Sequence, residues 1–114
     1  MHEYSIVQAL IEQCESLAQE HRACQVSKVS VKVGQLSGVE PYLLQTAFEA
    51  FKKTSEVCRR AELDMQIQAV EVFCLGCGET NRLSEHHYVC PACQSDRVTI
   101  TDGKEMFLMQ LEMA

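Results

Sequence analysis

Two close pairs of cysteines constrain this chain more than any other feature. Cys74 and Cys77 are separated by two residues, as are Cys90 and Cys93, and twelve residues lie between the pairs. This spacing lets one turn present two sulfurs to an ion, while a hairpin-length connector brings the second pair to its opposite side. The pattern predicts a tetrathiolate metal site. Two disulfides, or a thioredoxin-like centre built on one CxxC at a helix start, fit it less well.

Zinc is the expected metal, because four thiolates close its tetrahedral coordination. Such a site stabilises a fold and leaves no open position for chemistry, so it does not by itself name a function. Iron also suits tetrahedral sulfur, and an electron carrier is therefore an alternative reading of these ligands.

Composition narrows the classes of function. The 114 residues carry 16 acidic and 10 basic side chains, a formal net charge of -6, and no dense Lys/Arg run. This balance disfavours nucleic-acid binding, because a binder must neutralise phosphates. The sequence shows no apolar stretch of membrane-spanning length and no secretory signal, so we expect a cytoplasmic protein without membrane insertion. In such a reducing compartment Cys14, Cys24 and Cys58 would stay free thiols.

Hydrophobic periodicity predicts two amphipathic helices. Ser5 and Gln8 have the spacing of a capping box for the first, and Glu40 followed by Pro41 is typical of the start of the second. Cys14 is interpreted as a buried small hydrophobe. The expected core positions are Ile6, Val7, Leu10, Ile11, Cys14, Leu17 and Ala18 in the first helix, and Leu43, Leu44, Ala47, Phe48 and Phe51 in the second.

Alternation of apolar and polar residues predicts three strands. The first covers 27–33, the second leads towards the first cysteine pair, and the third follows the second pair. The residues expected to face the core are Val29, Val31 and Val33, then Leu63, Met65, Ile67 and Ala69, and finally Phe107, Met109, Leu111 and Met113.

The order of elements predicts an α+β fold: two helices on a small three-stranded sheet, with an inserted tetrathiolate zinc-knuckle lobe of zinc-ribbon or rubredoxin-like type. We expect the two strands that flank the knuckles to pair with each other and with the first strand. The predicted domains are an α/β domain over 1–70, completed by a final strand within 101–114, and a zinc-binding domain over 71–100.

The first three residues, Met1, His2 and Glu3, form a second candidate site. A histidine at position two can chelate a divalent metal through the terminal amine, its own amide nitrogen and its imidazole, a nitrogen set that suits nickel or copper(II). Glu3 and Glu40 are possible carboxylate complements. The plainer interpretations are a solvated terminus and ordinary surface or helix-capping carboxylates.

Two adjacent histidines, His86 and His87, lie near Cys90. They could replace a thiolate or bind a second ion. The more ordinary interpretation is a pair of exposed loop residues, because four cysteines already satisfy zinc.

Taken together, the Met-His-Glu start, the first amphipathic helix, the segment from Val33 to Glu40 and the paired CxxC knuckles followed by a strand resemble the HypA/HybF family of nickel metallochaperones. The resemblance covers essentially the whole chain. It implies that His2 is the principal nickel ligand, with the N-terminal backbone and Glu3 contributing. It also places an acidic residue at position 40, here Glu40, near the nickel, and implies structural zinc on Cys74, Cys77, Cys90 and Cys93.

The resemblance implies a protein that carries Ni(II) as cargo, docks with the HypB GTPase and passes nickel to the large-subunit precursor of a [NiFe] hydrogenase. Urease maturation factors are further partners in some relatives, and a homodimer stays open. No enzyme is expected, since the sequence shows no Ser/His/Asp grouping, phosphate loop or paired-carboxylate site. The competing function is a zinc-ribbon module that binds protein or nucleic acid, in which His2 has no metal role.

Overall fold

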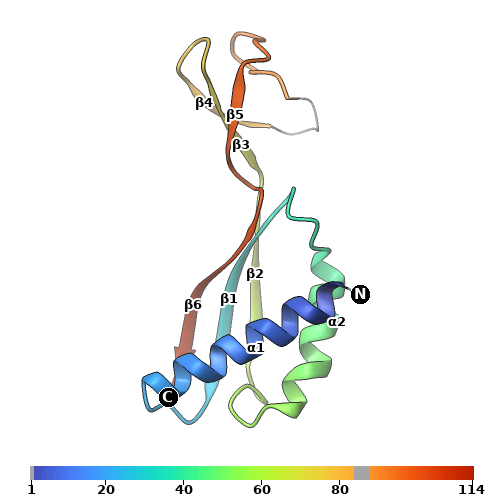
Figure 1. Ribbon diagram of the computed structural model, residues 1–114, viewed down its shortest axis with the longest axis vertical. Coiled ribbons are helices and arrows are strands. Elements are labelled where there is room, and N and C mark those ends of the chain that lie inside the picture. The colour runs from blue at the N-terminus through green and yellow to red at the C-terminus, as the bar shows by residue number, and fades with distance from the viewer. Residues whose placement is uncertain (1, 84–87) are drawn as a thin grey trace.

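The computed structural model describes residues 2–83 and 88–114 and confirms the predicted α+β class. Two helices and six strands follow one another along the described chain (Figure 1). They are α1 (His2–Glu20), β1 (Val26–Gly34), α2 (Pro41–Phe51) with a 3-10 turn η1 (Lys52–Thr54), β2 (Glu62–Gln68), β3 (Val70–Cys74), β4 (Thr80–Leu83), β5 (Val98–Asp102) and β6 (Met106–Met113). Within these residues no helix is both long and apolar enough to cross a membrane.

The larger sheet has the strand order β2-β1-β6. β1 runs parallel to β2, to which it is connected through α2, and antiparallel to β6. A parallel pair needs such a crossover, which a helix usually supplies. The expectation that β2 and β6 pair with each other is therefore wrong, because β1 lies between them.

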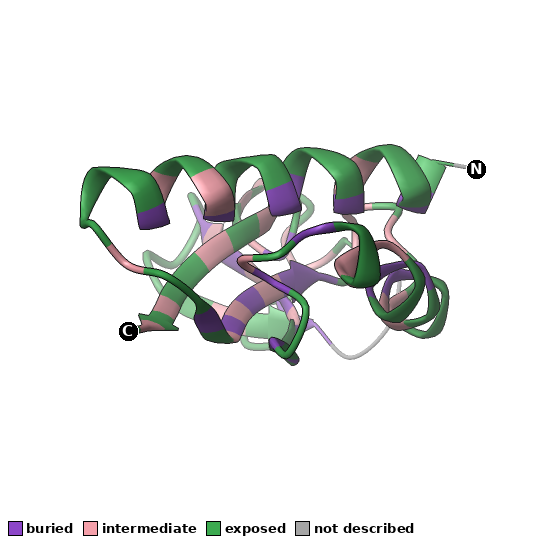
Figure 2. Cartoon of the chain, turned by 90° about the horizontal axis from the view of Figure 1, so that it is seen from below, coloured by how far each residue is buried: buried purple, intermediate pink, exposed green. Residues whose placement is uncertain are grey.

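Both helices pack on one face of this sheet, and the core lies between them (Figures 1 and 2). In Figure 2 the buried positions of α1 fall on the side that faces the sheet. Val29, Val31 and Val33 are all buried, as their alternation predicts, and Phe48 is the largest fully buried side chain. Leu43, which the periodicity placed in the core, is instead 46% exposed.

The two helix starts differ in how well the sequence predicted them. α1 already begins at His2, so Ser5 lies inside the helix and the predicted capping box is wrong. For α2 the prediction is confirmed: the Glu40 side chain accepts a hydrogen bond from the Tyr42 N–H, and Pro41 occupies the first helical position. Proline suits that position because its missing N–H would have no intrahelical partner there.

The face of β6 was predicted correctly for Leu111 and Met113 and wrongly for Phe107 and Met109. Its register against β1 shifts between the pairs Ser30/Gln110 and Val31/Leu108, so Met109 is the extra residue of a β-bulge. A bulge reverses which alternate residues face the core. Phe107 and Met109 are consequently 44% and 58% exposed. The side chains that pack on the core are Met106, Leu108, Leu111 and Met113.

The alternating run that was predicted to continue to Ala69 ends one residue earlier, and a separate strand follows. β2 stops at Gln68, and β3 begins at Val70 in a second sheet with the order β4-β3-β5. Leu63 is buried as predicted, but Ile67 is 49% exposed. The second sheet was not predicted. It has its own small core of Val70, Val72 and Leu83, with Leu36, Val98 and Ile100 packed against it.

The two sheets follow one another along a molecule of 52 × 28 × 16 Å, and they meet where three backbone segments cross. The Gln35 N–H donates to the Gln68 carbonyl at 3.0 Å, and the Leu36 N–H donates to the Gly103 carbonyl at 2.8 Å. A Cβ on Gly34 would lie 2.4 Å from the carbonyl carbon of Gly103. Only glycine permits this approach of two backbones.

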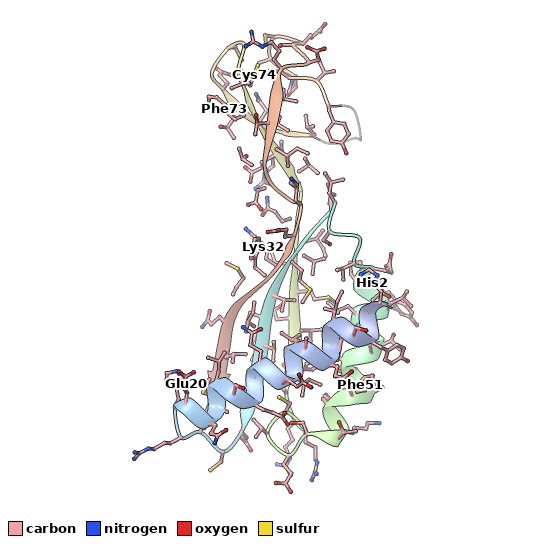
Figure 3. All side chains as sticks on the ribbon, in the orientation of Figure 1. His2, Glu20, Lys32, Phe51, Phe73 and Cys74 are labelled. Carbon is pink, nitrogen blue, oxygen red and sulfur yellow. The ribbon has the colours of Figure 1, made fainter. Side chains whose placement is uncertain are left out.

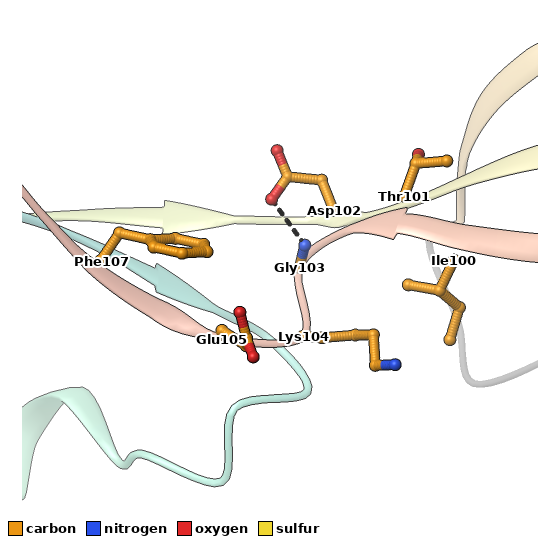
Figure 4. A pocket seen from close by; sticks show the side chains of 7 residues that line it. All are labelled: Ile100, Thr101, Asp102, Gly103, Lys104, Glu105 and Phe107. Carbon is orange, nitrogen blue, oxygen red and sulfur yellow. Dashed lines mark hydrogen bonds between the residues drawn. The ribbon is translucent and has the colours of Figure 1, made fainter.

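One ion pair also joins the two sheets at this crossing. The Lys32 ammonium of β1 lies 3.0 Å from the Asp102 carboxylate at the end of β5 and 5.7 Å from the centre of the Phe107 ring (Figure 3). Asp102 also accepts a hydrogen bond of 2.7 Å from the Gly103 N–H, beside a shallow surface pocket (Figure 4).

Candidate metal centres

The four predicted cysteines converge at the far end of the second sheet (Figure 3). Cys74 ends β3 and Cys77 lies in the turn that follows, while Cys90 and Cys93 lie in a matching turn. The two turns share one hydrogen-bond pattern. The Gly78 N–H donates to the Cys74 carbonyl at 2.8 Å, and the Gln94 N–H donates to the Cys90 carbonyl at 2.7 Å.

Both turns also require a left-handed residue directly after their second cysteine. Gly78 has φ 75° and Gln94 has φ 65°. A side chain such as that of Gln94 adopts this conformation only when the surrounding structure holds it there. The sequence marks the first turn with a glycine and gives no such sign for the second.

The sulfur positions fit a tetrahedral metal. All four Sγ atoms lie within 4.8 Å of one another, with Cys74 and Cys93 at 3.5 Å and Cys77 and Cys90 at 3.7 Å. Ligands about 2.3 Å from a zinc ion at the centre of a regular tetrahedron are about 3.8 Å apart. The donors therefore fit a single dication and leave no space for a substrate ligand.

The pKa values of Cys74 and Cys77 are shifted in opposite directions. The Cys77 N–H, at 3.4 Å from the Cys74 sulfur, is the main reason that the pKa of Cys74 is lowered to about 7. At Cys77 the Glu79 backbone lowers the pKa, but burial and the neighbouring sulfurs outweigh it and raise it to about 12. Sulfurs this close resist carrying negative charge together unless a cation compensates them, which is what a bound metal would do.

A polar side chain outside the cysteine motif supports the cluster. The Asn81 side-chain amide donates to the buried Cys90 sulfur at 3.9 Å. Such contacts orient metal ligands and are often as important as the ligands themselves. Sequence reasoning missed Asn81, since an isolated asparagine in a polar strand carries no recognisable signal.

The second candidate site lies at the start of α1, on the helix-covered part of the molecule (Figure 3). The His2 side chain is 59% exposed, and its Nδ1 lies 3.9 Å from Oε2 of Glu3. The first amides of a helix have no intrahelical acceptor. An accessible imidazole, free amides and a carboxylate are therefore assembled within two consecutive residues.

Glu3 is held in place, although it lies in the first turn of a helix. It is only 9% exposed, and its Oε2 accepts a hydrogen bond of 3.3 Å from the Glu40 N–H. Its own backbone N–H and that of Glu40, followed by the nearby His2, lower the pKa of Glu3 below its ordinary value. Glu3 is consequently ionised at neutral pH and links the start of α1 to the start of α2.

Glu40 is brought to the same place by its backbone, while its side chain caps α2. One carboxylate oxygen accepts from the Tyr42 N–H at 3.3 Å. His2, Glu3 and Glu40 thus come together, and the tetrathiolate cluster lies at the opposite end of the molecule (Figure 3). His86 and His87 lie outside the described residues.

Comparison with known proteins agrees with this arrangement of sites. Residues 1–113 match the family model described as "Hydrogenase/urease nickel incorporation, metallochaperone, hypA". A hydrogenase maturation factor HypA from Shewanella baltica is 54% identical over 113 residues, covering 99% of this chain and 96% of that protein. The protein of the same name from Helicobacter hepaticus is 46% identical over 114 residues, covering 99% and 97%.

Two solved structures share the fold. The solution structure of the Ni metallochaperone HypA from Helicobacter pylori has a TM-score of 0.71 and 38% identity, covering 97% of this chain and 96% of that one. A second solution structure, of HypA protein, has a TM-score of 0.77 and 40% identity, covering 100% of this chain and 97% of that one. This chain therefore belongs to the HypA family, whose members are metallochaperones, and not enzymes, that incorporate nickel during hydrogenase maturation.

Proposed function

We propose that this protein binds Ni(II) at the start of α1 and delivers it to the large-subunit precursor of a [NiFe] hydrogenase together with the HypB GTPase. The observation that carries the proposal is the exposed His2 imidazole, 3.9 Å from a carboxylate that the Glu40 N–H holds in place. His2 would be the principal ligand, with the terminal amine and the backbone nitrogens beside it completing a nitrogen-rich set.

A cation bound at the start of a helix requires compensating negative charge. The N-terminus of α1 carries a partial positive charge, which opposes a cation. Two negative charges offset it in the proposed complex: the ionised Glu3 carboxylate and the amide nitrogen that loses its proton on binding. Nickel affinity should therefore fall as the pH falls, which also provides a route to release.

Glu3 and Glu40 are proposed as the carboxylate part of the site. Glu3 already uses Oε2 for the Glu40 N–H, so its contribution would be to fix the imidazole and to add charge. Glu40 uses one oxygen for the helix cap and has a second oxygen available to nickel or to a water on nickel.

We propose that the tetrathiolate cluster holds structural zinc and that 71–100 form the zinc-binding domain. The nickel-binding domain would be 1–70 completed by 101–114. Zinc is favoured because the closed sulfur set has the dimensions of its tetrahedral sites. A cytoplasmic location follows from the proposed role, because the hydrogenase precursor and the GTPase would be met there. Delivery to urease maturation factors and a homodimer are compatible additions.

The test is a nickel titration of untagged, zinc-loaded protein. We expect His2→Ala to weaken Ni(II) binding by at least about tenfold, because it removes the only side-chain nitrogen of the proposed set. Zinc content and the melting temperature should not change. The matched control is His21→Ala, an exposed histidine in the turn that follows the other end of the same helix. Equal nickel affinity in His2→Ala and wild-type protein would exclude this site.

A residue added before Met1 separates two forms of the site. If the terminal amine is a ligand, the extension should weaken nickel binding, since an amide there is a much poorer donor. Retained affinity would restrict the ligands to the imidazole, the carboxylates and internal amides.

A further inference from the structure

One edge of the larger sheet is open to a further strand. In the order β2-β1-β6, β6 lies at the outside, and no other strand among the described residues pairs with its free edge (Figure 1). β6 contains no lysine, arginine or proline, and its one acidic residue is Glu112. Natural edge strands usually carry such residues, because unpaired backbone N–H and C=O groups otherwise accept another strand. The opposite edge strand, β2, exposes both Glu62 and Asp64.

The hydrophobic side chains of β6 are only partly covered. No residue of this strand is fully buried, and the four that pack on the core also line two open pockets between α1 and β6. These pockets, of about 360 and 300 Å³, share Gln13 of α1 and Leu108 of β6 in their linings. They form an apolar groove along the free edge, and a strand added to β6 would cover its half-exposed side chains.

The side chains of β6 that pack on the core read the same in both directions. They are Met106, Leu108, Leu111 and Met113, and the bulged residue Met109 lies between the two halves. In an antiparallel pair of two β6 strands, a two-fold axis between residues 109 and 110 places each Met106 opposite a Met113 and each Leu108 opposite a Leu111. Directly opposite residues share a face of the sheet, so all of these side chains stay on the helix-covered face.

We propose that two copies of this chain associate through their β6 strands, which pair antiparallel about this axis and join the two three-stranded sheets into one continuous sheet. A two-fold interface brings the same patch of both chains together, so a strand that reads the same in both directions is self-complementary. The bulge favours a second copy over an unrelated strand. A regular strand must oppose the two bulged residues with one, as β1 does, whereas a second β6 opposes them with its own two.

This arrangement leaves both candidate metal sites free. Because the two β6 strands run in opposite directions, the two tetrathiolate lobes point to opposite ends of the dimer. His2 lies on the α2 side of the sheet, away from β6, and stays accessible to a nickel-binding partner (Figure 3). The inference does not depend on nickel binding at His2.

The first test is analytical ultracentrifugation of untagged, zinc-loaded protein from micromolar to millimolar concentration. We expect a reversible monomer–dimer equilibrium. Met109→Lys should raise its dissociation constant at least about tenfold, because two ammonium groups would meet beside the axis on an edge that lacks such protection. The matched control is Ile67→Lys on the opposite edge strand, where the native side chain is 49% exposed against 58% for Met109. This control should leave the dissociation constant unchanged.

The second test measures the register by cross-linking, in protein that also carries Cys24→Ser to remove an exposed thiol outside the metal cluster. In the proposed pair, residue 107 of one copy lies opposite residue 112 of the other. A mixture of Phe107→Cys and Glu112→Cys proteins should therefore form a disulfide-linked dimer on mild oxidation. Either variant alone should form little, because its two sulfurs would lie about 17 Å apart along the strands.

Three results would overturn the proposal. A protein that stays monomeric at millimolar concentration would leave the β6 edge to an extended segment of a different protein. A dimer that Ile67→Lys weakens as much as Met109→Lys does would not be held by β6. Cross-links that form as readily in either cysteine variant alone as in the mixture would exclude the antiparallel register.

Discussion

The two ends of this molecule hold their candidate metal sites in opposite ways. At the tetrathiolate end, four sulfurs from two matching turns close around one point, and Cys74 and Cys90 are fully buried. At the other end, His2 is mostly exposed on the first turn of a helix, and only Glu3 is fixed by a contact with a distant residue. A closed donor set retains an ion, whereas an open one can exchange it with a partner.

This contrast extends to what each region needs in order to fold. The helix-covered sheet has a continuous core in which Leu44, Ala47, Phe48 and the β1 valines are almost completely buried. The second sheet has three buried hydrophobic residues in its own core, helped by Leu36 from the β1–α2 connection. A core this small cannot hold three short strands together, so the metal must supply much of the stability of this lobe.

The largest expected effect is therefore the loss of the tetrathiolate lobe. Cys77→Ser should release the metal and expose the amides of residues 70–102 to hydrogen exchange, because the folding free energy of the lobe comes largely from metal binding. The amides of α1 and β1 should stay protected. Metal analysis combined with hydrogen exchange would measure both.

The reciprocal variant is Phe48→Ala. Emptying this fully buried position should destabilise the helix-covered sheet by about 3–5 kcal/mol and leave the metal content unchanged. If Cys77→Ser retained the metal, or if both variants loosened both regions equally, the two parts would not be independent in stability.

The parts of the fold that the sequence predicted well are those set by local periodicity and capping. The valines of β1 and the Glu40 cap of α2 depend on neighbours within a few residues, and both were predicted correctly. The predicted capping box at Ser5 failed because the helix begins three residues before Ser5, at His2, and Glu3 in its first turn accepts a hydrogen bond from the distant Glu40. The candidate nickel residues His2 and Glu3 were similarly recognisable as a sequence motif. The hydrogen bond between Glu3 and the Glu40 N–H, which joins the starts of the two helices, was not predictable from that motif.

The errors in the pairing of β2 with β6 and in the face of β6 have one physical cause, which is that pairing is decided between segments distant in sequence. Because of a bulge at Met109 against β1, Phe107 and Met109 are exposed while Leu111 and Met113 pack on the core, and the alternation of β6 alone does not reveal this change. β4 is a four-residue strand with the sequence Thr-Asn-Arg-Leu, too short and polar to predict. β5 alternates Val98 and Ile100 with threonines, a strand signal that was available and was missed.

The next largest expected effect on stability comes from the close approach of Gly34 and Gly103, where the two sheets meet. Gly34→Ala would place a methyl group 2.4 Å from both the carbonyl carbon and oxygen of Gly103. Backbone atoms cannot move aside cheaply, so we expect a loss of about 2 kcal/mol or more in the free energy of unfolding. Small-angle scattering should also show a change in the radius of gyration from its value near 17.3 Å.

Gly38→Ala is the matched control for this substitution. Gly38, unlike Gly34, has a positive φ, 78°, but no atom lies within 4 Å of the position of its Cβ. It should lose only about 1 kcal/mol through backbone strain and leave the scattering curve unchanged. A similar loss and an unchanged curve in both variants would show that the crossing does not fix the two regions.

The smallest expected effect concerns the ion pair between the sheets. The Lys32 ammonium, followed by the Gly103 N–H, lowers the pKa of Asp102 below its ordinary value of 3.8. A carboxyl whose folded pKa is lowered contributes stability at pH values above 3.8, and that contribution disappears as the pH falls through the folded pKa. Asp102→Asn should therefore melt slightly below the wild-type protein at neutral pH, and the difference should vanish in acid.

A series of thermal melts across this acid range measures the effect. Lys32→Met should remove the same pH-dependent contribution to stability, because it deletes the principal cause of the lowered pKa of Asp102. If the difference in melting temperature between wild-type and Asp102→Asn protein stayed constant down to strongly acidic pH, the contribution of Asp102 to stability would come from its packing and hydrogen bonding and not from its charge.

The glycine crossing has a consequence for chain topology. A Cβ on Gly103 would lie 2.8 Å from the Ala69 carbonyl oxygen, so the chain leaves for the second sheet and returns from it at almost the same point. The entire segment from Val70 to Asp102 is therefore an insertion whose two ends lie next to each other. Replacing it with a tight turn would require little new loop-closure entropy, since the cost of joining two ends grows with the length between them. The second lobe is thus an insertion that could in principle be removed without changing the order or direction of the strands in the first sheet.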